Sequence, residues 1–211
     1  LSSDRREEAN RWASLSLTRS KSLKGKIQNP FAFEGLRMAG AVQLELLEGQ
    51  SRTLVSKRIS NSNEIQVEFA QLRQQAQSLA QQYAQLAQAG QAETSVGALY
   101  RVAELQEGLA NILVQAPNPN GMSVSDVETF RARIEKIALP LQEEATKLYA
   151  QALEKAHEAE VISPYTQLLQ EKLSVSRPDD YKKLVEVMPA PSYMSHELPI
   201  NQETKGIVED E

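Results

Sequence analysis

Few side chains in this sequence have the types and spacing that metal binding requires. Glu154 and His157 stand three residues apart and form one Glu-x-x-His pair, whereas di-iron carboxylate proteins use two such pairs. The second pair is missing, because the only other histidine is His196. The chain has no cysteine, which excludes disulfides, cysteine–zinc sites, iron–sulfur clusters and cysteine nucleophiles. We therefore expect no metal site and no cofactor.

Paired acids are candidates for catalysis. Glu143 and Glu144 could serve as general acid and base in a muramidase-like helical enzyme. Adjacent residues on a helix point apart, however, and such acids usually lie in water. The sequence contains neither a Gly-x-Ser-x-Gly nucleophile motif nor a glycine-rich phosphate loop. We expect no catalytic residue and no enzyme, and keep a cell-wall lytic glycosidase as a second alternative.

Charge divides the chain into a basic start and an acidic end. Residues 1–28 contain seven Lys or Arg and three Asp or Glu, whereas residues 187–211 contain five acids and one lysine. A candidate basic patch near the start is formed by Arg19, Lys21, Lys24 and Lys26. Such a run is often a solvated helix end, but it could also contact anionic wall polymer or lipid head groups. Because the net charge is −5, nucleic acid is not an expected partner.

Composition favours helices. Of 211 residues, 41% are apolar and only 5% aromatic, and glycine and proline together number 18, few for a protein with many tight turns. No uninterrupted apolar stretch is long enough to cross a membrane. The chain begins at Leu1, so we expect a mature or trimmed chain whose export signal is not part of it.

Apolar periodicity and capping signals predict seven helices. Asn29-Pro30 and Ser163-Pro164 each place a cap residue before a proline at the first helical position. Pro140 falls inside a continuous pattern, where it should end or kink one helix and open the next. The predicted helices cover residues 4–24, 30–59, 63–89, 93–115, 123–139, 140–159 and 164–173. This divides the chain into a basic N-terminal helix (1–28), a helical domain (29–186) and an acidic, proline-containing tail (187–211).

The helix predicted over 63–89 has the clearest pattern. Its apolar residues alternate in steps of four and three: Ile65, Phe69, Leu72, Ala76, Leu79, Tyr83 and Leu86. Such a heptad seam is typical of an intermolecular coiled coil, and equally of one arm of an antiparallel helix hairpin. We favour the hairpin, because three heptads are marginal on their own and a suitable partner helix follows.

Two further helices carry the small-and-large spacing of a tetratricopeptide unit. The first contains Leu99, Val102 and Ala103, with Gln106 where an aromatic residue is usual, and the second contains Ala145, Tyr149 and Ala152. Together with Ala116-Pro117-Asn118-Pro119 and Ala138-Leu139-Pro140-Leu141, these segments make residues 65–184 resemble the last repeats of large periplasmic tetratricopeptide proteins of gliding and predatory bacteria, the gliding-motility type. The resemblance implies a helical solenoid, a periplasmic or envelope location and a scaffolding role.

These observations give a fold and a function to test. We expect an all-α protein of irregular antiparallel helix pairs, similar to a tetratricopeptide solenoid. It would bind a protein partner in a helix-lined groove of an envelope complex; the first alternative is self-association through helix 63–89. We also expect Ala145 and Ala152 to be buried at a helix crossing. A stripe of Phe130, Ile134 and Ile137 should pack on helix 93–115, and the tail should lie along the helices.

Overall fold

The fold is all-α, as expected. A computed structural model describes residues 3–22, 30–62, 64–89 and 91–182. Every regular element in these ranges is a helix. The six helices are α1 (Ser3–Ser22), α2 (Pro30–Val55), α3 (Ile65–Ala89), α4 (Ala92–Val114), α5 (Val124–Glu158) and α6 (Pro164–Ser176).

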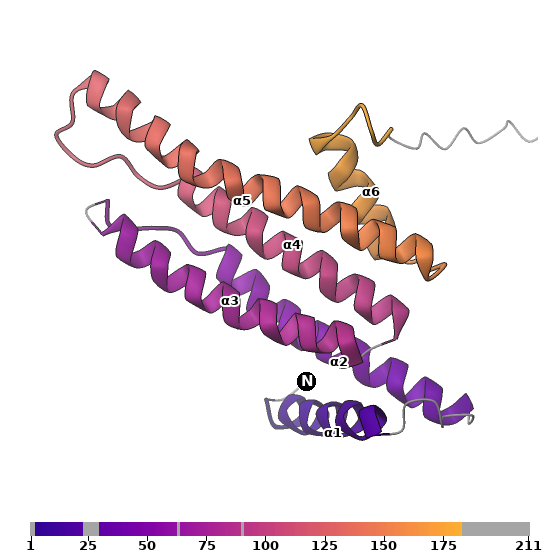
Figure 1. The fold of residues 1–211 in the computed structure, drawn as a ribbon. Helices are drawn as coiled ribbons and strands as arrows, with labels where there is room; N and C mark the ends of the chain where they lie inside the picture. The colour runs from indigo at the N-terminus through magenta and orange to yellow at the C-terminus, as the bar shows by residue number, and fades with distance from the viewer. Residues whose placement is uncertain (1–2, 23–29, 63, 90, 183–211) are drawn as a thin grey trace, which may run out of the picture.

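Helix α4 is the centre of the arrangement. It packs against α2, α3, α5 and α6, while α1 packs mainly on α2. Figure 1 shows α3, α4 and α5 side by side, with α6 placed across the C-terminal half of α5. Consecutive helices therefore cover one another, and α6 closes the face of α4 and α5 that the earlier helices leave open.

The heptad seam of α3 is buried inside the chain. Leu72, Leu79 and Tyr83 belong to the main apolar core, and α3 packs on α4 and α2. This is the arrangement that the hairpin interpretation predicted. The glutamine-rich face of the same helix is exposed to solvent.

The prediction that Pro140 separates two helices is wrong. Helix α5 runs for 35 residues through Pro140, after a capping box in which the Ser123 hydroxyl accepts a hydrogen bond from the amide of Asp126. Proline removes the amide that would bond the carbonyl of Lys136. Both Pro140 and Lys136 are exposed, so water can solvate that carbonyl. Ile134, before the proline, and Ala145, after it, are both buried, so packing holds the two halves in line.

The stripe predicted for the first half of α5 is correct in part. Phe130 and Ile134 pack into the main core, and α5 covers α4 as expected. Ile137, however, is 52% exposed. The buried stripe continues instead through Ala138, because steps of four residues from Phe130 and Ile134 keep it on the same side of the helix.

Glycine allows close approach between α2 and α4. A Cβ atom on Gly97 would lie 2.7 Å from Cδ2 of Leu44, and one on Gly40 would lie 2.7 Å from the hydroxyl oxygen of Thr94. A Cβ atom on Gly108 would collide with the side chain of Val55. Gly49, in contrast, has open space around it. The small residues on α4 thus bring the backbones of the two helices together.

Candidate binding groove between α5 and α6

A groove of about 870 Å³ lies between α4, α5 and α6, and we call it the α5–α6 groove. Helix α4 contributes Glu107 and Asn111. The remaining lining comes from α5 and from α6 with the residue that follows it, chiefly Leu139, Gln142, Glu143, Thr146, Lys147, Leu168, Glu171, Lys172, Val175 and Arg177. The groove is therefore built by elements that lie far apart in the sequence.

The amphipathic pattern of α6 determines which side chains reach the groove. Leu169 and Leu173 are fully buried in a second apolar cluster, shared with α4 and α5. Leu168, Lys172 and Val175 follow one another at steps of four and three, which places them on a neighbouring face of the helix. Burial of the first face thus directs the second along the groove.

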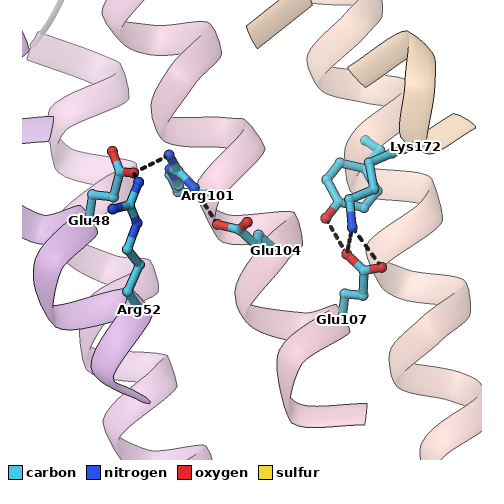
Figure 2. Close-up of polar contacts among 7 residues, drawn as sticks. Glu48, Arg52, Arg101, Glu104, Glu107 and Lys172 are labelled. Atoms are coloured by element: carbon cyan, nitrogen blue, oxygen red, sulfur yellow. Dashed lines mark hydrogen bonds and ion pairs between the residues drawn. The ribbon is translucent and has the colours of Figure 1, made fainter. Parts of the chain in front are cut away.

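Glu107 is held by two side chains at the groove. The hydroxyl of Tyr149 donates a hydrogen bond to Oε2 of Glu107 at 2.7 Å, and Nζ of Lys172 lies 2.9 Å and 2.7 Å from the two carboxylate oxygens. Figure 2 shows Glu107 of α4 facing Lys172 of α6. Burial, together with the hydrogen bond to Glu107, raises the pKa of Tyr149 above its usual range. The tyrosine stays protonated and the contact joins α4, α5 and α6.

A second ionic cluster lies on another side of α4. Arg101 forms ion pairs of 2.6 Å with Glu48 of α2 and with Glu104, and Glu48 also pairs with Arg52 (Figure 2). Residues three apart on a helix are turned by about 60° from one another, so Arg101, Glu104 and Glu107 point in successively different directions.

The electrostatics of Arg101 favour its charged form despite its burial. Burial opposes the charge on Arg101, but the hydrogen bond to Glu104 and the nearby carboxylate of Glu48 outweigh it and raise the pKa of Arg101. Its guanidinium carbon lies 5.3 Å from the ring centre of Tyr100 and 5.8 Å from that of Tyr165. This cluster joins α2 to α4 rather than lining the groove.

Most of the residues with tetratricopeptide-like spacing meet in one place. Ala103, Ala145, Tyr149 and Ala152 are buried in the second cluster, and Leu99 packs against it. Val102 packs against the main core instead. Ala145 and Tyr149 also line the groove. The close contact between α4 and α5 is made where small residues were expected.

The other candidate residues do not form a site in the described part of the chain. Arg19 is exposed on α1, whereas the side chains of Lys21, Lys24 and Lys26 and the whole 187–211 tail lie outside the described residues. Glu154 and His157 are exposed, as are Glu143 and Glu144. Within the described ranges, no group of three or more His, Asp or Glu residues is placed to hold a metal ion.

Sequence reasoning missed the ionic residues. Arg101 carried a signal, since it interrupts the apolar stripe of α4 between Ala98 and Leu105, and a charged residue in a buried stripe requires a buried partner. Glu107 and Lys172 carried no comparable signal, because they are separated by 65 residues and meet only through the fold.

Comparisons with models of protein families, with curated proteins and with solved structures find no match for this chain. Among the helices of the described residues, none has the length and apolar character that crossing a bilayer requires.

Proposed function

We propose that the protein is a non-catalytic interaction scaffold of a bacterial envelope complex, and that it binds a segment of a partner protein in the α5–α6 groove. The observation that carries the proposal is the set of apolar side chains that remain accessible along this groove. Leu139 is 55% exposed and Val175 is 80% exposed, and Leu168 lies between the same helices. Apolar residues gathered in a groove with a polar rim are typical of surfaces that receive a peptide or helix.

The charges of the groove fit a binding role. The carboxylate of Glu107 already has two partners, Tyr149 and Lys172, which hold it within the wall. Around it, Lys147 and Arg177 balance Glu143 and Glu171, so the groove as a whole is close to neutral. A partner segment with apolar anchors and little net charge would suit this surface.

A tetratricopeptide-like solenoid is the arrangement we propose for these helices. The small residues at the contact between α4 and α5 and the packing of successive helices support it. The helices are nevertheless long, since α5 alone has 35 residues and a complete tetratricopeptide unit has about 34. The proposed array is therefore irregular. The envelope or periplasmic location rests on the resemblance to gliding-motility proteins.

The two alternatives have less support. Self-association through residues 63–89 would have to use the glutamine-rich face, because the apolar seam of α3 is already covered. Light scattering at increasing concentration tests it, and a monomer would argue against it. A lytic glycosidase would use acids such as Glu143, and release of fragments from purified cell wall would support that activity.

The proposed function can be tested by capture of partners from a bacterial envelope extract. The groove variant combines Leu139→Glu with Val175→Glu, and both positions are more than half exposed, so the fold should survive. The matched control combines Val67→Glu on α3 with Val124→Glu at the start of α5; these positions are 57% and 80% exposed and lie outside the groove. We expect the unmodified protein and the control to retain the same partner and the groove variant to lose it. Equal capture by all three would contradict the proposal.

A further inference from the structure

We propose that residues 187–200 of the protein's own tail bind in the α5–α6 groove as an extended segment and compete there with the partner. This inference rests on the proposed function, since it adds regulation to the same groove. The apolar side chains that are exposed in the groove would be stabilised by contact with an apolar segment. Residues 187–200 of the same chain are rich in apolar side chains and could supply that contact.

The place where the described chain ends puts the tail within reach. Arg177, directly after α6, lines the groove. Tyr181 packs against the second apolar cluster, so the chain is still attached to the helices shortly before Lys182. Val187 follows Arg177 by ten residues, which can span up to about 35 Å when extended. The segment can therefore return to the groove without any rearrangement of the helices.

The composition of the segment suits an extended apolar ligand. Six of its side chains are large and apolar: Val187, Met188, Tyr193, Met194, Leu198 and Ile200. Three prolines, Pro189, Pro191 and Pro199, oppose a helix and favour extended backbone. A segment with this backbone loses less conformational entropy on binding than a flexible one.

Charge distinguishes binding of the tail in the groove from binding of the tail to the basic N-terminal region. Residues 187–200 contain a single acid, Glu197, and most tail acids follow this segment. The groove is nearly neutral, so binding there should be almost independent of salt. Binding of the acidic end to the basic residues of the N-terminal region would instead weaken strongly as salt rises.

Spin-label distances in the full-length chain test the inference directly. Because the chain has no cysteine, Val175→Cys with Ser192→Cys introduces the only two thiols. We expect a short, narrow distance distribution between these labels that is the same in low and high salt. Adding Leu139→Glu and Leu168→Glu to the labelled chain should broaden it. The control pair, Val67→Cys with Ser192→Cys, should give a long mean distance. The groove substitutions should broaden this distribution without shortening its mean.

Three outcomes would overturn the inference. One is a broad distribution of the distance between the labels at positions 175 and 192 in the chain without groove substitutions, which the groove substitutions leave unchanged. Another is a narrow distance that is lost in high salt, which would place the tail on a charged surface. The third is loss of the narrow distance when labelled protein is diluted with unlabelled protein, which would assign the groove to the tail of a second copy.

The partner experiment separates this inference from the proposed function. If the tail occupies the groove nine tenths of the time, apparent partner affinity is lowered about tenfold. Met194→Ser with Leu198→Ser should then raise capture by up to that factor. Unchanged capture by this tail variant, alongside a loss in the groove variant, would reject the tail and keep the groove. A narrow label distance with equal capture by the groove variant would keep the tail and reject partner binding there.

Discussion

The hydroxyl of Tyr149 donates a 2.7 Å hydrogen bond to Oε2 of Glu107, across the contact between α5 and α4. A hydrogen bond to a charged group contributes about 1.5–3 kcal/mol. Tyr149→Phe should lower the free energy of unfolding by roughly the smaller of these values, because Glu107 keeps its ion pair with Lys172. Urea denaturation measures the loss. Tyr181→Phe is the control, and an equal effect in both variants would contradict the contribution of this bond.

Buried tyrosines should make the protein sensitive to alkali. Burial, with a contribution from Glu104, raises the pKa of Tyr100 to about 12, whereas an unfolded tyrosine ionises near about 10. At a pH between these two pKa values, Tyr100 is ionised in the unfolded chain but still protonated in the folded one. The unfolded chain therefore binds fewer protons, and the free energy of unfolding must fall as pH rises. Unfolding midpoints measured across this range should decline, and the decline should be shallower in Tyr100→Phe. A flat profile would contradict the burial of this hydroxyl.

Two glycines should respond to alanine with opposite signs. Gly108→Ala places a methyl group against Val55 of α2, which should force the helices apart and cost about 1–3 kcal/mol. Gly49→Ala meets nothing within 4 Å and should stabilise α2 by about 0.5–1 kcal/mol, because alanine is the better helix former. Thermal unfolding compares them. An unchanged or raised stability of Gly108→Ala would mean that α2 and α4 are not in close contact at Gly108, and a loss of stability in Gly49→Ala would contradict the open space around Gly49.

Ala152 tests the packing of α5. It is fully buried in the second apolar cluster. Ala152→Phe should overpack this contact and lower stability by about 1–3 kcal/mol. Gln151→Phe adds the same side chain at the neighbouring exposed position and should change little. Equal melting temperatures for both variants would show that this face of α5 is not packed.

Two arginines that share a carboxylate should differ in their contribution to stability. Arg101 and Arg52 both pair with Glu48, but the Arg101 side chain is 10% exposed and that of Arg52 is 74% exposed. Arg101→Met should lower the free energy of unfolding by about 3–5 kcal/mol, because the negative charges of Glu48 and Glu104 lose the buried positive charge that both of them contact. Arg52→Met should cost less than about 1 kcal/mol. Chemical denaturation of both variants is the measurement, and similar losses would refute the difference in burial.

Periodicity allowed much of the fold to be predicted, because it reports which face of each helix avoids water. Six of the seven seam residues from Ile65 to Leu86 are buried, and Phe69 is partly buried against the main core. Ala145 and Ala152 are also buried, as that reasoning requires. The continuity of α5 could not be predicted in the same way. Whether Pro140 breaks a helix depends on whether water reaches the freed carbonyl, and this is decided by the packing of α5 on α4.

The groove was beyond sequence reasoning for a related reason. Its polar residues come from three helices, and the pair formed by Glu107 and Lys172 joins positions 65 residues apart. Neither residue breaks the pattern of its own helix, so nothing local marks them. The heptad seam, in contrast, was visible because all of its residues belong to one helix.

The central position of α4 determines when a growing chain can complete its structure. Val96, Tyr100 and Ala103 lie on α4, but the side chains that cover them belong to α5 and α6. A nascent chain that has emerged only as far as α4 can cover one side of this helix with α2 and α3, and leaves the other side exposed to water. On the ribosome, this apolar strip stays available to chaperones until α5 and α6 follow. Translation pauses between α4 and α5 should therefore be more harmful to yield than pauses after α6.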